Sequence, residues 1–367
     1  MKCRLGYILI LLCTACVDRI TFDIEAPDNF PIAVEGFISD EPGPYTVKIS
    51  KAFDIESKQS IKTPISVNRV TLSDDAGNAE NLVRVADGEY QTNPLGIRGT
   101  IGRAYTLEVE TLDGRVYRST PDPLLPAGTI TEVYSHYKAE TSADGATEYG
   151  FDVLFNSTAG EQQNFYFLWK FVGTFQVETN PELYTVNCGE SRCPAPLPCS
   201  GYVWNGALTY VSPCECCTCW SKFFNTEPVV SDNQVVKDGL FRDVKIGYVP
   251  ITEWTFMHKV HAEVQQFSLS PRAFAFWKAI KDQKRATGSL FEPQAGKIPT
   301  NFTQLSGKSG PIEGLFYATA ITRNSIYITR NDVPNQSVIP EVELLFTDHC
   351  EKLYPNTTTV KPDFWVD

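Results

Sequence analysis

The stretch AYTLEVETLDGRVYRS, residues 104–119, decides the fold. Tyr105, Leu107 and Val109 alternate with polar residues, so its first half predicts a strand with one apolar face. Asp113-Gly114 then supplies a tight turn, and the second half returns as the partner strand. Residues 104–119 therefore predict a β-hairpin that covers a core with one face.

Similar short strands surround this hairpin. In PYTVKIS, residues 44–50, the side chains of Tyr45, Val47 and Ile49 fall on one face. Short strands at regular spacing, separated by Asp-Gly turns, predict an immunoglobulin-like or transthyretin-like sandwich over residues 31–122. The proline-rich stretch PDPLLPAG, residues 121–128, predicts the joint to a second domain.

Residues 129–367 predict a larger antiparallel β-domain, because aromatic and apolar residues alternate along several long segments. The strongest of these segments is FYFLWKFVGTFQV, residues 165–177. One helix over residues 271–286 interrupts the strands: Ser270-Pro271 can cap it, and Phe274 and Trp277 recur at helical spacing. The expected fold class is thus mainly β, with one helix and a cysteine-rich loop.

The composition agrees with strands and turns and restricts the partners. The 367 residues include 16 Tyr, 22 Phe, 24 Pro and 24 Gly. The formal net charge of −12 disfavours nucleic acid as a partner. An acidic exterior is also repelled by anionic lipid, so any membrane attachment requires an anchor other than a basic face.

The first residues, MKCRLGYILILLCTAC, predict that anchor. A basic start and a short apolar run predict a signal peptide over residues 1–15. Cys16 follows Ala15 as in a bacterial lipobox, which predicts lipid attachment (palmitate) at Cys16, although Cys13 stands where a Leu is usual. The alternative is an ordinary cleaved signal with Cys16 as a free or bridged thiol.

Residues 16–30 then serve as lipid anchor and tether. The acidic residues of this tether are compatible both with a surface-export signal and with a plain solvated linker.

A cysteine-rich loop over residues 188–220 is the most distinctive internal feature. Once Cys16 is set aside, an even number of cysteines remains in the exported chain, which predicts disulfide bonds. The disulfide candidates are Cys188, Cys193, Cys199, Cys214, Cys216, Cys217, Cys219 and Cys350. We expect Cys350 to tie the C-terminal segment to the loop. The alternative is zinc at the overlapping pairs Cys214–Cys217 and Cys216–Cys219.

No catalytic motif occurs in the chain, so we expect no catalytic residues, no cofactor and no metal site. His258 and His261 lie three apart on an expected strand, where they point to opposite faces. Rigid aromatic residues on a constrained loop favour recognition, which makes Tyr202, Trp204, Tyr210 and Trp220 a possible contact surface. The alternative is that these aromatic residues pack beneath the loop and only hold it in place.

Several stretches together resemble a lipoprotein family of the Bacteroidetes, the domain of unknown function 4249. They are the lipobox, residues 34–50, CCTCW at 216–220, residues 270–302 and residues 347–365, with SLFEPQAGKIPTN (289–301) the most distinctive. The resemblance implies an outer-membrane lipoprotein, often encoded beside a TonB-dependent transporter, and it implies no catalytic residues.

The leading hypothesis is a non-catalytic accessory or ligand-binding partner of a TonB-dependent nutrient transporter, anchored by lipid in the outer membrane and potentially exposed on the cell surface. One alternative is a cell-surface hydrolase of glycans or peptides, which requires paired carboxylates or a metal in a cleft. A second alternative is a structural surface lipoprotein.

Overall fold

The computed structural model describes residues 31–51, 63–141, 145–160, 165–231, 236, 238–286, 298–341 and 345–366. Within them, strands dominate, and the expectation of a mainly β fold with one α-helix is confirmed. The expected signal peptide (1–15), the tether (16–30) and Cys16 lie outside the described residues.

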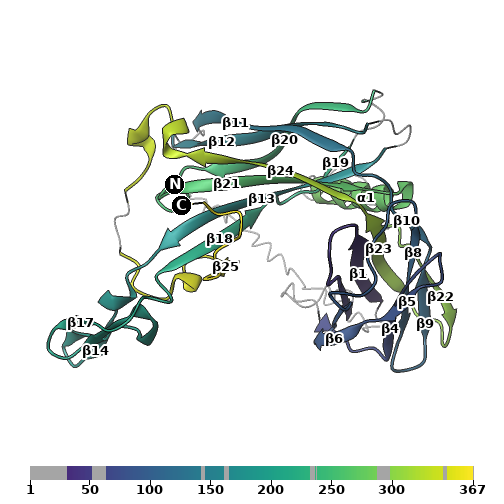
Figure 1. Ribbon diagram of the computed structural model, residues 1–367, viewed down its shortest axis with the longest axis horizontal. Coiled ribbons are helices and arrows are strands. Elements are labelled where there is room, and N and C mark those ends of the chain that lie inside the picture. Colours follow the sequence, from purple (N-terminus) through teal and green to yellow (C-terminus); the bar gives the residue numbers. More distant parts are fainter. Residues whose placement is uncertain are drawn as a thin grey trace, which may run out of the picture.

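The N-terminal sandwich consists of two sheets, which we call N1 and N2 (Figure 1). Sheet N1 contains β1 (Ile32–Ser39), β2 (Thr46–Lys51), β3 (Thr63–Pro64), β6 (Val83–Ala86), β7 (Glu89–Gln91) and β23 (Ile312–Thr319). Sheet N2 contains β4 (Arg69–Asp74), β5 (Ala79–Asn81), β8 (Ala104–Glu110), β9 (Val116–Ser119), β10 (Asp122–Pro123) and β22 (Phe302–Ser306).

The hairpin predicted over residues 104–119 is β8–β9. Tyr105, Leu107 and Val109 of β8 are all buried, in one core with Val47 and Ile49 of β2. The predicted alternation in both strands is therefore confirmed. It gives each sheet one apolar face, and these two faces pack against each other.

The C-terminal sandwich packs sheet C1 onto sheet C2, around a second core rich in aromatic residues. Sheet C1 contains β11 (Thr129–Thr141), β12 (Thr147–Thr158) and β20 (Leu240–Pro250). Sheet C2 contains β13 (Phe167–Glu178), β18 (Thr218–Phe224), β19 (Val229–Val230), β21 (Lys259–Ser268), β24 (Ile321–Thr329) and β25 (Thr357–Thr358).

The division between the two sandwiches is not a single cut in the sequence. The expected boundary assigned everything after residue 129 to the larger domain, whereas β22 and β23 complete the N-terminal sandwich. β22 pairs with β9, and β23 pairs with β1 in parallel. Gly314 makes that pairing possible, since it has a φ of +99° and a Cβ there would overlap the Val34 carbonyl oxygen.

The helix α1 (Pro271–Ala286) begins where the sequence predicts, and Ala286 is the last described residue before a gap. Ser270 caps it: the backbone N–H of Ala273 donates to Ser270 Oγ at 3.1 Å. Phe274 and Trp277 pack in a third apolar cluster with Leu168 of β13 and Tyr317 of β23. The aromatic stripe of α1 thus joins the two sandwiches.

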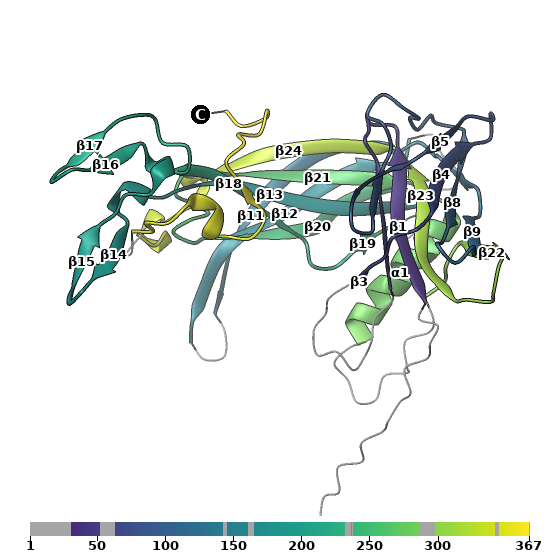
Figure 2. The same cartoon turned by 90° about the horizontal axis from the view of Figure 1, so that it is seen from below.

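The molecule forms an arch. The C-terminal sandwich spans its length, with the N-terminal sandwich at one end and a pair of hairpins projecting at the other (Figures 1 and 2). These hairpins are β14 (Thr185–Cys188) with β15 (Ser191–Pro194), and β16 (Tyr202–Trp204) with β17 (Leu208–Tyr210). Short 3-10 turns complete the fold: Pro181–Leu183, Pro198–Ser200, Arg330–Asp332, Gln336–Val338 and Cys350–Lys352.

Candidate functional site: a projecting arm and a recessed sheet face

The arm comprises residues 181–217, between the end of β13 and the start of β18. Disulfides connect Cys188 to Cys193, Cys199 to Cys216 and Cys214 to Cys217 within it. A fourth disulfide joins Cys219 of β18 to Cys350. The prediction that these eight cysteines form disulfides is confirmed, and so is the expected tie from Cys350 to the cysteine-rich loop.

The zinc alternative is not supported by this pairing. Cys214 and Cys217 are bonded to each other, while Cys216 and Cys219 have separate partners. His349 lies close to two of the disulfides, Cys199–Cys216 and Cys219–Cys350. Because zinc is held by thiolates, sulfur atoms that are already bonded to each other cannot serve as its ligands.

Three of the four predicted contact residues lie together on the β16–β17 hairpin. Tyr202 and Tyr210 face each other across its strands, with ring centroids 5.5 Å apart. Trp204 and Tyr210 are 48% and 59% exposed, so they do not simply pack beneath the loop. Trp220 differs, because it is buried in β18 against Trp365 and does not share the surface of the hairpin.

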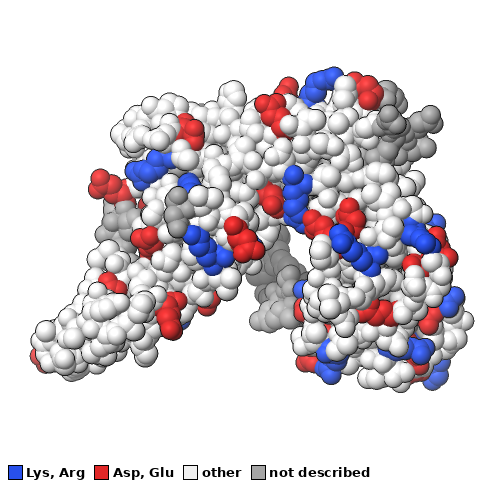
Figure 3. All heavy atoms as spheres, viewed as in Figure 1, with Lys and Arg blue, Asp and Glu red and all other residues white. Residues whose placement is uncertain are grey.

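The arm also differs from the rest of the molecule in charge. Residues 193–214 contain no Lys, Arg, Asp, Glu or His. Figure 3 shows few charged side chains over the arm, at lower left, whereas acidic and basic side chains are interspersed over the N-terminal sandwich. Exposed Val203, Leu208 and Val211 add apolar surface to the aromatic residues. Depletion of charge together with enrichment in aromatic side chains is typical of the core of a protein–protein interface.

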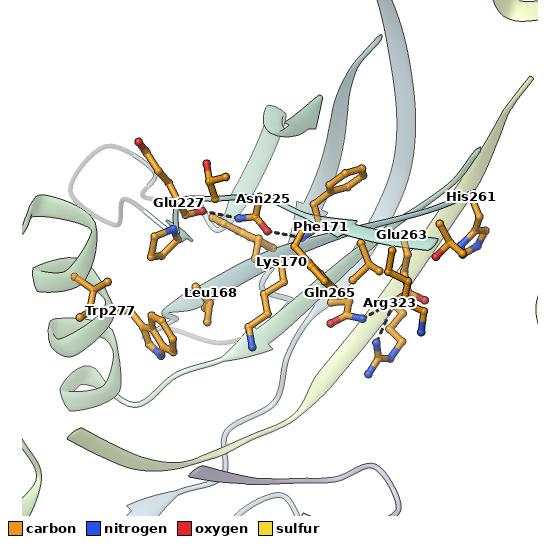
Figure 4. Close-up of a pocket in the computed structure, with 18 of the residues that line it drawn as sticks. Leu168, Lys170, Phe171, Asn225, Glu227, His261, Glu263, Gln265, Trp277 and Arg323 are labelled. Atoms are coloured by element: carbon orange, nitrogen blue, oxygen red, sulfur yellow. Dashed lines mark hydrogen bonds and ion pairs between the residues drawn. The ribbon is translucent and has the colours of Figure 1, made fainter. Parts of the chain in front are cut away.

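The second candidate surface is the outer face of sheet C2, where the concave side of the arch contains a recess of about 810 Å³ (Figure 4). Along β13 the side chains alternate: Trp169 and Phe171 enter the core, while Leu168, Lys170 and Val172 face the recess. Trp277 of α1 closes one end of this recess.

Lys170 is the central charged group of the recess. Its Nζ lies 4.4 Å from the ring centroid of Phe267 and 5.7 Å from that of Phe37, and no described residue offers it a hydrogen bond or an ion pair. Burial lowers the pKa of the Lys170 ammonium, and the positive charge of Arg323 lowers it further.

Arg323 of β24, by contrast, is fully engaged. Its guanidinium donates to both carboxylate oxygens of Glu41, at 2.7 and 2.6 Å, and to Glu263 Oε1 at 3.1 Å. Glu41 follows β1 and Glu263 lies on β21, so this cluster links the two sandwiches.

The two histidines do not form a joint site. His258 precedes β21 and is hydrogen-bonded to Glu178 Oε1 at 3.0 Å. His261 is buried within β21 and stacks on Phe364, with ring centroids 4.1 Å apart. Burial lowers the pKa of the His261 imidazole. Each histidine is therefore engaged by neighbouring side chains and not by the other histidine.

The sequence model of the family described as Domain of unknown function (DUF4249) matches residues 17–325. The chain belongs to this family. The match includes strands of both sandwiches, the arm and α1, and it ends within β24, before β25 and Cys350. No curated protein matches the chain. Among the described residues, no helix is long and apolar enough to cross a membrane.

Sequence reasoning missed the recess of this DUF4249 protein, although one signal for it was present. Lys170 is the only charged residue in the apolar segment 165–177. A charge in such a strand needs a special environment, because an unpaired ammonium is costly to bury. The other walls come from α1, β21 and β24, and no local pattern brings those elements together.

Proposed function

We propose that this protein is a lipid-anchored outer-membrane protein that acts as a non-catalytic accessory or ligand-binding partner of a TonB-dependent nutrient transporter. The observation that carries the proposal is the aromatic arm, whose residues 193–214 carry no charged side chain. Its exposed Trp204 and Tyr210 are held on a hairpin within a segment that three disulfides constrain. A rigid aromatic surface loses little conformational entropy when a protein partner covers it.

Two further features support the proposal. Disulfides form and persist in oxidising compartments, which agrees with export directed by residues 1–15. Anchoring through Cys16 would join the membrane to the N-terminal sandwich, because β1 begins at Ile32. The arm would then extend from the opposite end of the arch (Figure 2), away from the anchored sandwich.

The hydrolase alternative gains no support from the recess. Its carboxylates, Glu227 and Glu263, lie well apart in Figure 4. Each is engaged by an arginine, Arg285 at 3.7 Å and Arg323 at 3.1 Å. A glycoside hydrolase requires two carboxyl groups that face each other across the scissile bond.

Affinity purification from gently solubilised outer membranes tests the proposal. We expect the wild-type protein to copurify with a TonB-dependent barrel in stoichiometric amount. The double variant Trp204→Ala/Tyr210→Ala should recover at least about tenfold less barrel, because aromatic anchors dominate interface energies.

The matched control is Leu95→Ala/Leu112→Ala, which removes two side chains that are 95% and 74% exposed on the N-terminal sandwich. It should recover as much barrel as the wild type. Recovery of the wild-type protein without any barrel would contradict the transporter role and favour the structural alternative.

A further inference from the structure

The recess on sheet C2 continues into the junction between the sandwiches. Lys170, Trp277 and Ile280 line both the recess and a second cavity of about 530 Å³. The further walls of that cavity include Phe37 of β1 and Tyr317 of β23. The two spaces therefore adjoin at Lys170 and Trp277, and we call them together the junction cleft.

The walls around Lys170 are apolar and aromatic. Phe37 contacts both Phe267 and Tyr317, with ring centroids 6.1 and 5.6 Å away, and Trp277 lies 6.4 Å from Tyr317. Leu315 completes this wall. A ligand held here would bury an apolar or aromatic body against these rings.

The Lys170 ammonium has three donors and no acceptor among the described residues. Figure 4 shows it pointing away from the sheet, into the open recess. The nearby carboxylates of Glu41 and Glu263 are already bound to Arg323. An unmade hydrogen bond at a partly buried charge is costly, and the described residues supply no acceptor, so a ligand that carries an acceptor would satisfy Lys170.

The charges around Lys170 favour a single negative charge on that ligand. Glu35 and Lys48 also line the second cavity, and Lys48 pairs with Glu89 at 2.9 Å. The neighbouring charge that acts on Lys170, however, is that of Arg323.

Lys284 of α1 donates to the Thr226 carbonyl oxygen at 2.7 Å, so it is already engaged. Lys222 also faces the recess, but it pairs in register with Thr174, four residues along β13 from Lys170. Four residues of strand span about 13 Å, so the backbones of the two lysines are well separated along the sheet.

We propose that the junction cleft binds a small organic monocarboxylate with an apolar or aromatic body, whose carboxylate accepts hydrogen bonds from Lys170 Nζ. The inference is independent of the arm. Binding of the carboxylate can be measured on the isolated protein, whereas docking through the arm requires the transporter. A failure of either proposal would therefore leave the other standing.

Isothermal titration of the full mature chain provides the test. The probes are N-acetyl-L-phenylalanine and octanoate, each compared with its neutral amide. We expect each acid to bind at least about tenfold more tightly than its amide, because a charge-assisted hydrogen bond distinguishes the two. The variant Lys170→Met keeps the apolar stem and should bind acid and amide equally.

Lys222→Met is the matched control, because it removes a lysine from the same recess at a distance from the cleft. This variant should keep the wild-type preference for acid over amide. Lys170→Met should still fold, with a raised midpoint of thermal unfolding, because it removes a desolvated charge. If the variant does not fold, the comparison of acid with amide in the wild-type protein still tests the proposal. Equal binding of acids and amides by the wild type, or no saturable binding of either acid up to about 10 mM, would overturn the proposal.

Discussion

Asp122 shows how one buried side chain fastens separate elements together. Its Oδ1 accepts a hydrogen bond from Ser270 Oγ at 2.6 Å, and its Oδ2 accepts one from the backbone N–H of Ala318 at 3.0 Å. Ser270 caps α1 and Ala318 lies in β23, so the carboxylate of β10 holds the helix and the returning strand in place. Burial raises the pKa of Asp122, while its two hydrogen bonds oppose that shift.

We predict that Asp122→Ala lowers the free energy of unfolding by about 2–5 kcal/mol, because it leaves two buried donors without an acceptor. Asp122→Asn keeps one carbonyl acceptor and should cost less. Urea denaturation measures both variants. An Ala variant within about 0.5 kcal/mol of the wild type would contradict the role of this carboxylate.

The pH dependence offers a second check on Asp122. Because the folded-state pKa lies above the unfolded value of about 3.9, the folded protein binds more protons between the two values. The stability of the wild type relative to Asp122→Asn should therefore fall as pH rises through this window, and it should level off above the folded-state pKa.

At this scale the sequence was informative only where the signal is local. Ser270 was predicted as a helix cap from Ser270-Pro271, and the cap is present. Asp122 lies in PDPLLPAG, which predicted only a joint, because its partners are 148 and 196 residues away. The role of Lys170 depends in the same way on rings from β1 and β21.

The disulfides constrain chain segments of very different length. Cys188–Cys193 closes a separation of 5 residues within one hairpin, whereas Cys219–Cys350 closes a separation of 131. The even number of cysteines predicted disulfides, and Cys350 was expected to bond to the cysteine-rich loop. The pairing itself could not be derived, because eight cysteines allow about 105 connectivities.

Removing these two disulfides separately should have unequal effects. In the chain-entropy treatment, Cys219→Ala/Cys350→Ala should cost about 5 kcal/mol of unfolding free energy and Cys188→Ala/Cys193→Ala about 2 kcal/mol. Denaturation in urea under non-reducing conditions compares the two variants. Equal losses, or a larger loss for the hairpin variant, would contradict the idea that the long-range bond stabilises the body and the short one shapes only the arm.

Local sequence patterns do not predict which sheets β23 and β24 join. The apolar pattern of FYATAITRNSIYIT, residues 316–329, predicts a late strand or pair of strands, and the structure has two strands here that enter different sheets. Ala320, buried between them, is where the chain crosses from the N-terminal sandwich to sheet C2. Pairing partners far away in the sequence decide the sheet that each strand joins: β23 pairs with β1 and β24 pairs with β21.

For the whole molecule, the arch explains how two separate surfaces can coexist. The junction cleft lies where the sandwiches meet, and the arm projects from the far end of the C-terminal sandwich (Figure 1). The Arg323 cluster and the aromatic face of α1 hold the two sandwiches together at the cleft. Docking through the arm would therefore leave the cleft open.

Site-specific photocrosslinking in intact cells tests the central claim most directly. A photoreactive p-benzoylphenylalanine is placed at position 204 on the arm or, as a control, at position 112 on the N-terminal sandwich. The account predicts a crosslink to a TonB-dependent barrel from position 204 and none from position 112. Crosslinks to the barrel from position 112 alone, or none from either position while the protein is present at its normal level, would contradict docking through the arm.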